Sequence, residues 1–189
     1  MKTIVVVVAV ILLFGLLLVG GRLVSARNEM VAQREAIHGA WSQVDVVLER
    51  RADLIPNLVA TVKGFASQEQ SVIDSVTQAR AALLGARTAG DRIQANSALD
   101  AALGRLLVVV ENYPQLRSSE NFLRLQDELA GTENRIAVER RKYNEAVQRY
   151  NTNIALFPNN IAASLFGFER EDAYFQTAPA TREVPQVEF

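Results

Sequence analysis

Residues 118–157 read SSENFLRLQDELAGTENRIAVERRKYNEAVQRYNTNIALF, and this stretch decides the fold class. Large apolar or aromatic side chains recur in it at an unbroken spacing of seven, at Phe122, Leu129, Ile136, Tyr143, Tyr150 and Phe157. A second row begins at Leu125 and ends at Val147 and Ile154, with an offset from the first row that changes from three to four. Such spacing is typical of a straight helix packed on several others. We therefore predict one helix from about Ser118 to Phe157, with these rows in a bundle core.

The segments before this helix are also predicted to be helical, because apolar residues recur every three or four positions and no stretch alternates with a period of two. The first carries Met30, Ile37 and Val44, with Trp41 expected in the core. Pro56 cannot donate a hydrogen bond to the Ala52 carbonyl, so we expect a kink or a restart near residues 53–55.

Two further segments are bounded by clear signals. The second is expected to end near Gly85. The third is expected to begin after Thr88, whose spacing to Asp91 resembles a capping box, and to stop before Tyr113 and Pro114. Long helices with short connections favour antiparallel neighbours. The predicted fold is all-α: an N-terminal single-pass membrane helix, then an elongated antiparallel helical bundle of about four segments and a short C-terminal helix.

The membrane helix is predicted from the uncharged run TIVVVVAVILLFGLLLVGG, from Thr3 to Gly21. As a helix this run spans roughly 28 Å, close to the ~30 Å hydrocarbon core, so we expect membrane lipid around it. A cleaved signal peptide ending at Val24-Ser25-Ala26 is the alternative, although the run is longer than usual for one. More arginines follow the run than precede it, which weakly favours a cytoplasmic over a periplasmic body.

Composition excludes several classes of function. With 20 basic and 21 acidic residues the formal net charge is −1, which argues against a nucleic-acid binder. The chain has no Cys and one His, His38, so disulfides, thiolate nucleophiles and Cys-ligated metals are excluded. No phosphate loop, nucleotide fingerprint or nucleophile elbow is present. We therefore expect no enzymatic activity, no cofactor and no metal, and His38 is expected to face solvent or to pack.

Several blocks of sequence resemble the LemA family of bacterial membrane proteins. They occur in the family's order and include residues 40–46 (AWSQVDV), 50–59 (RRADLIPNLV), 111–116 (ENYPQL), 132–137 (TENRIA) and 157–160 (FPNN), with Tyr-Asn pairs at 143–144 and 150–151. The resemblance implies a single membrane helix followed by a helical bundle, and it implies no established reaction. One branch of the family is associated with magnetosome membranes, but nothing in this chain ties it to that role.

These expectations divide the chain into a membrane anchor (1–21), a LemA-like helical bundle (22–168) and an acidic, mostly irregular tail (169–189). Within the FPNN block, Pro158 should end the long helix. We expect a short helix over residues 161–166, which either Asn159 or Asn160 could cap and which Gly167 should terminate.

Charged residues interrupt the long helix at Glu133, Asn134, Arg135, Glu139 and Arg140. An ion-pair network across the bundle is favoured, and a partner-binding surface or catalysis are the alternatives. For Arg50-Arg51-Ala52-Asp53, helix-end electrostatics are favoured over a docking site. The aromatic residues around the short helix, including Tyr174, could meet another subunit or lipid. The candidate interaction surface comprises Glu133, Arg135, Glu139, Arg140, Phe157, Phe166, Phe168 and Phe175.

Two functions remain open. The favoured one is a non-enzymatic, membrane-anchored structural or assembly protein whose bundle self-associates into a homo-oligomer. The alternative is a membrane-tethered adaptor or sensor that binds an unknown protein partner, with the acidic tail as its docking segment. The size of the detergent-solubilised particle distinguishes them.

Overall fold

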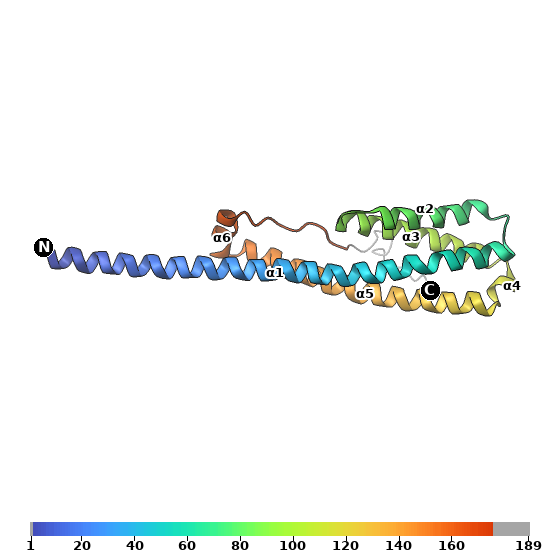
Figure 1. Ribbon diagram of the computed structural model, residues 1–189, viewed down its shortest axis with the longest axis horizontal. Helices are drawn as coiled ribbons and strands as arrows, with labels where there is room; N and C mark the ends of the chain where they lie inside the picture. The colour runs from blue at the N-terminus through green and yellow to red at the C-terminus, as the bar shows by residue number, and fades with distance from the viewer. Residues whose placement is uncertain (1, 176–189) are drawn as a thin grey trace, which may run out of the picture. The chain divides into compact units, whose positions relative to one another are not determined.

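The computed structural model describes residues 2–175, and within them all regular secondary structure is helical (Figure 1). The predicted all-α class is therefore confirmed. The helices are α1 (Lys2–Phe65), α2 (Gln70–Gly85), α3 (Ala89–Val110), α4 (Pro114–Arg117), α5 (Glu120–Ala155) and α6 (Asn159–Phe166). Of the expected acidic tail, residues 176–189 lie outside the described part, and residues 169–175 form no helix or strand.

The chain divides into two compact units, and both α1 and α5 contribute to each of them. The first unit comprises Met1–Ala40 and Glu145–Asp172, and the second comprises Trp41–Asn144 and Ala173–Phe189. The two ends of α1 therefore belong to different units, and so do the two ends of α5.

The second unit is a four-helix bundle built from the C-terminal part of α1, α2, α3 and the N-terminal part of α5. Successive helices run in opposite directions, and the short α4 joins α3 to α5 (Figure 1). The predicted rows supply much of its core: Phe122, Ile136 and Tyr143 are buried, and Leu129 is half-buried. From the other helices the core takes Leu48, Leu58, Ile73, Leu83, Leu99 and Leu106, among others.

Of the kink or restart expected near residues 53–55, the restart is wrong, because α1 continues through Pro56 to Phe65, and the kink stays a prediction. Proline leaves the carbonyl four residues earlier without its helical donor. That carbonyl belongs to Ala52, and it accepts a hydrogen bond of 2.7 Å from Nε of Arg80 in α2. A side chain from another helix therefore replaces the missing backbone donor, and the break comes instead at residues 66–69.

The other predicted boundaries in the second unit are confirmed. α2 ends at Gly85, and α3 ends at Val110, before Tyr113 and Pro114. Thr88 is the N-cap of α3, and its hydroxyl accepts a 3.1 Å hydrogen bond from the Asp91 amide. A capping hydroxyl of this kind satisfies one of the backbone donors that the first turn leaves free.

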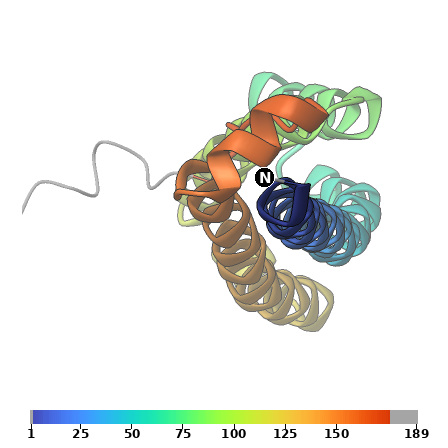
Figure 2. The ribbon, with the colours of Figure 1, turned by 90° about the vertical axis from the view of Figure 1, so that its left-hand side faces the viewer.

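The first unit contains the N-terminal part of α1, the C-terminal end of α5, and the whole of α6. Figure 2 shows α6 beside α1. Tyr150 and Ile154 continue the buried rows, but Phe157 is 78% exposed, so its predicted core position is wrong. The reason is that α5 ends at Ala155, after which the seven-residue spacing no longer sets the direction of a side chain.

The turn between α5 and α6 differs in part from the prediction. Asn159 is the first residue of α6 and Pro158 is its N-cap, and no side chain makes a capping hydrogen bond, so the expected asparagine cap is wrong. Gly167 does end the helix, with a φ of 70° in the left-handed region that favours glycine. The amide of Phe168 then donates to the Ala163 carbonyl at 2.9 Å.

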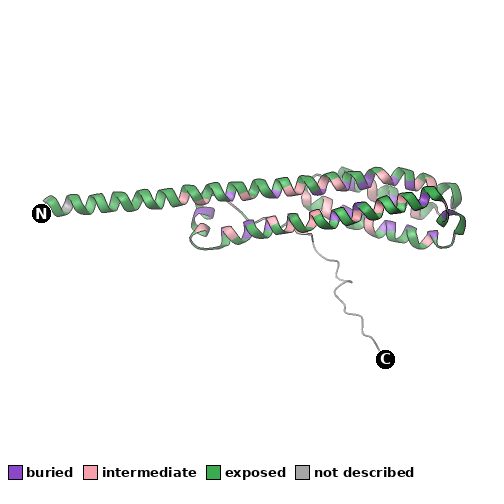
Figure 3. Cartoon of the chain, turned by 90° about the horizontal axis from the view of Figure 1, so that it is seen from below, coloured by how far each residue is buried: buried purple, intermediate pink, exposed green. Residues whose placement is uncertain are grey.

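The apolar stretch, residues 3–21, forms part of α1, and each of its described side chains is exposed (Figure 3). It is a candidate membrane span, because α1 is long and apolar enough to cross a bilayer. Within the described residues α3 is also long and apolar enough to cross a bilayer, but 39% of its most apolar stretch is buried. Since α3 supplies Leu99, Leu103 and Leu106 to the core, we assign it to the bundle interior.

Candidate functional site

An ion-pair network connects three helices of the second unit. Nη1 of Arg51 in α1 lies 2.5 Å from Oδ1 of Asp100 in α3 and 2.8 Å from Oε2 of Glu133 in α5. The guanidinium of Arg140 lies 3.5 Å from Asp100 and 4.0 Å from Glu133. Asn96 completes the arrangement by donating to Oδ2 of Asp100 at 3.0 Å.

The network holds two positive and two negative charges, so it is neutral as a whole. The Arg51 side chain is only 8% exposed, while the side chains of Asp100 and Glu133 are 35% and 42% exposed. A buried guanidinium is tolerated when charged partners surround it. Each of these two carboxylates lies near both Arg51 and Arg140. This arrangement is better suited to holding helices together than to transferring a proton.

The position of Arg51 contradicts the interpretation that we predicted for the motif at residues 50–53. It lies in the interior of α1 and is buried, so helix-end electrostatics does not explain Arg50-Arg51-Ala52-Asp53. The signal was in the sequence, because Val44, Arg51 and Leu58 share the spacing of seven that marks the core face. A charged residue on such a row indicates a buried ionic partner elsewhere.

The other predicted charged residues are not brought together. Glu139 pairs with Lys142 on the same helix at 2.8 Å, and Arg135 and Asn134 are exposed. Among the described residues no group of three or more His, Asp or Glu side chains is placed to hold a metal ion. The charged centre of α5 is thus divided between a network inside the bundle and a face turned to solvent.

The predicted aromatic residues occupy different environments. In the first unit the guanidinium groups of Arg27 and Arg34 lie over the rings of Phe166 and Phe168, at 5.9 and 5.4 Å. In the second unit Trp41 is half-buried, and its ring centroid lies 5.3 Å from that of Tyr143 and 6.1 Å from that of Phe175. Arg140 also lies over the ring of Phe175, at 5.1 Å.

Two asparagines of α5 bind the extended chain that follows α6, a role that was not predicted from the sequence. In the first unit, Asn151 donates to the Glu171 carbonyl at 2.7 Å and accepts from the Glu171 amide at 2.9 Å. In the second unit, Asn144 makes the same pair of bonds with Phe175, at 2.9 and 3.0 Å. The signal was the Tyr-Asn pair repeated at a spacing of seven.

The tyrosine of the second pair takes part in the same attachment. The Tyr150 hydroxyl donates to the Glu169 carbonyl at 2.8 Å, and the residue is 2% exposed. Burial raises the pKa of Tyr150 above its usual value, because a phenolate would lose its hydration there. At neutral pH this hydroxyl is therefore a stable donor.

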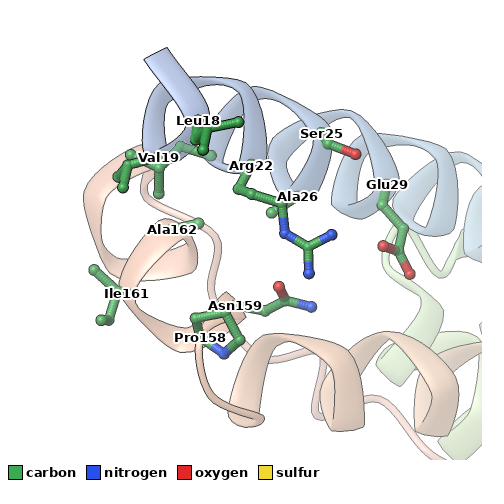
Figure 4. A pocket seen from close by; sticks show the side chains of 11 residues that line it. Leu18, Val19, Arg22, Ser25, Ala26, Glu29, Pro158, Asn159, Ile161 and Ala162 are labelled. Atoms are coloured by element: carbon green, nitrogen blue, oxygen red, sulfur yellow. The ribbon is translucent and has the colours of Figure 1, made fainter. Parts of the chain in front are cut away.

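A hollow of about 520 Å³ lies between α1 and α6 in the first unit (Figure 4). Leu18, Val19, Ile161 and Ala162 line one end of it, Arg22 and Asn159 lie near its middle, and Glu29 lies at the other end. A smaller hollow of about 230 Å³ in the second unit borders Arg51 and Glu133 and is otherwise mostly apolar. The first is the larger of the two and is open to a ligand with both apolar and charged parts.

Comparison with known proteins identifies relatives over most of the chain. Magnetosome protein MamQ 2 of Paramagnetospirillum magneticum is 30% identical over 179 residues, covering 81% of this chain and 65% of that protein. Magnetosome protein MamQ of Magnetospirillum gryphiswaldense is 28% identical with the same coverage. Protein LemA of Metamycoplasma hominis is 25% identical over 141 residues, covering 74% of this chain and 64% of that protein. The chain thus spans somewhat less than two thirds of the length of these relatives.

A family model described as the LemA family matches residues 40–189, which is more than half of the chain. The matched part contains the helical bundle, the ion-pair network and both Tyr-Asn pairs. With the all-α fold and the candidate membrane span, this match leads to one conclusion: the chain belongs to the LemA family.

Proposed function

We propose that this protein is a non-enzymatic, membrane-anchored structural or assembly protein that acts as a homo-oligomer. The observation that carries the proposal is the continuity of α1, which runs unbroken from the apolar stretch to Phe65 in the bundle. The same helix would thus be both the anchor and a core element. The relatives that bear the name magnetosome protein support a role at a membrane.

Anchoring favours self-association for a physical reason. Copies in one bilayer share an orientation, so less rotational freedom is lost when they associate. Copies related by rotation about the membrane normal can form a closed ring through one repeated contact. A monomer would instead favour the tethered adaptor or sensor.

The surface that we propose for this contact is the solvent-facing side of the charged centre of α5. Gly131, Arg135 and Val138 follow one another at helical spacing and are all exposed. Val138 is 38% exposed, and a side chain added at Gly131 would meet no atom within 4 Å in the monomer. Gly131 and Val138 lie two turns apart on the same face of α5, and the missing side chain at Gly131 lets another helix approach that face closely.

Cysteine cross-linking in membrane vesicles tests this surface, because the chain contains no native cysteine. Gly131→Cys should form a cross-linked dimer with a short bifunctional maleimide. Gly64→Cys, at an equally open and exposed helical glycine of α1 with no exposed valine within two turns, is the matched control and should remain a single chain. Equal cross-linking at both positions, or none at Gly131, would reject the α5 face as the contact.

A further inference from the structure

The first unit exposes an apolar patch at the turn between α5 and α6 and along α6. Its members are large apolar side chains with exposed fractions of 39–78%: Leu156, Phe157, Ile161, Leu165 and Phe166. The opposite side of α6 is covered, because Ala162 and Ala163 are 1% and 4% exposed. So many exposed apolar residues within eleven positions indicate a surface that meets something apolar.

The hollow between α1 and α6 joins this patch to the apolar stretch. Leu18 and Val19 lie within the last turn of the stretch, and they line the hollow together with Ile161 of α6 (Figure 4). If residues 3–21 cross a bilayer, residues 18–22 lie at the boundary between acyl chains and headgroups. The hollow and the patch would then both lie in the bilayer at the depth of this boundary.

The charge in the hollow also fits a lipid. Arg22 borders the apolar end, and within residues 2–175 no carboxylate is recorded within 4 Å of its guanidinium. Glu29 lies two turns further along α1, at the other end, and accepts a 3.1 Å hydrogen bond from Gln33. An arginine beside an apolar hollow matches a phosphate attached to acyl chains.

A second copy of the chain is the main competing occupant of the patch. It would have to bury Arg22 at the level of the headgroups, where phosphates are its natural partners. A short helix with one apolar face at that depth is typical of an interfacial membrane helix. The observations therefore favour lipid.

We propose that the hollow between α1 and α6 is a phospholipid site, in which an acyl chain lies along Leu18, Val19 and Ile161 and the phosphate meets Arg22. The exposed face of α6 rests in the interface of the same bilayer. This inference rests on the membrane insertion that the proposed function assigns to α1.

Spin labels on single cysteines test the site in the full-length protein, reconstituted in phosphatidylcholine vesicles with or without phosphatidylglycerol. Labels at Ile161→Cys and Leu165→Cys should be more accessible to oxygen than to a water-soluble nickel chelate. Leu123→Cys on α5, a leucine that is 46% exposed, is the matched aqueous control, and Leu12→Cys is the reference within the bilayer.

The outcomes separate this inference from the proposed function. Water-accessible labels at positions 161 and 165, with Leu12→Cys protected, would overturn the lipid site and leave the anchor intact. Water accessibility at position 12 as well would overturn both. Protection of the label at position 161 from both oxygen and the nickel chelate, together with direct spin exchange between copies, would identify a second copy as the occupant and reject lipid.

The role of Arg22 is tested by Arg22→Gln, with Arg50→Gln as the control at an exposed arginine of the same helix. Phosphatidylglycerol should increase the depth of the label at position 161 in the parent and in the control. That increase should be lost with Arg22→Gln. If it persists, the assignment of the phosphate to Arg22 is wrong.

Discussion

At the scale of single residues, Arg80 explains how α1 passes through a proline. Its Nε donates to the Ala52 carbonyl, which Pro56 in α1 cannot reach with a backbone N–H. The sequence alone could not reveal this, because Arg80 lies 24 positions after Pro56 and meets Ala52 only when α2 folds back on α1. The rule that proline interrupts a helix was sound, but a tertiary contact offset it.

A double-mutant cycle tests this explanation. Arg80→Met should lower the free energy of unfolding by about 1–3 kcal/mol, because it leaves a part-buried carbonyl unpaired. In a Pro56→Ala background the restored backbone N–H can donate to the Ala52 carbonyl. Arg80→Met should therefore lower the free energy of unfolding by clearly less in that background. Equal costs in the two backgrounds, measured by chemical unfolding in detergent, would contradict the account.

The buried Tyr150 hydroxyl predicts a specific dependence of stability on pH. Because burial raises its folded pKa above the usual 10.0, the unfolded chain loses this proton first as the pH rises. The stability that Tyr150 contributes is thus complete below about pH 10 and is lost above it. Thermal melting should show Tyr150→Phe less stable than the parent at pH 8, with the difference shrinking above pH 10. A constant difference would argue against burial of the phenol.

At the scale of elements, apolar spacing predicted the helices well and side-chain partners poorly. The rows of α5 and the signals around α3 fixed their limits within about two residues, since they depend on local chemistry. The attachment of residues 169–175 was missed, because the asparagine contacts join segments 20 or more positions apart. The position of Arg51 on a core row was visible, but its partners Asp100 and Glu133 were not.

The network predicts a contrast between two adjacent arginines. Arg51→Met should lower the free energy of unfolding by about 1–3 kcal/mol, because Asp100 and Glu133 lose a charged partner. Arg50→Met is the matched control at an exposed neighbour and should change it by less than about 0.5 kcal/mol. Similar effects at both positions in chemical unfolding would refute the structural role of the network.

The Asn151 attachment predicts a local effect on amide exchange. Asn151→Leu removes both hydrogen bonds to Glu171, each worth about 1 kcal/mol, so the Glu171 amide should exchange roughly tenfold faster or more. Asn134→Leu, at an exposed asparagine of the same helix, should leave that amide unchanged. Unchanged exchange in Asn151→Leu would show that other contacts hold the segment.

At the scale of the whole molecule, α1 and α5 are the elements that both units share, and α1 also carries the candidate span. The ion-pair network and the asparagine contacts act within units, so they account for stability rather than for action on another molecule. The function that we propose uses two surfaces instead: the outer side of α5 and the face of α6 beside the apolar stretch. This is why we place self-association and lipid contact at the centre of the account.

The mass of the full-length protein in a mild detergent, measured by native mass spectrometry, tests the central claim most directly. The chain has a mass of 20.8 kDa. The account predicts a defined multiple of this mass at micromolar protein, with bound phospholipid retained. A single species at the mass of one chain, together with single chains after cross-linking in the membrane, would contradict the assembly role and favour the tethered adaptor.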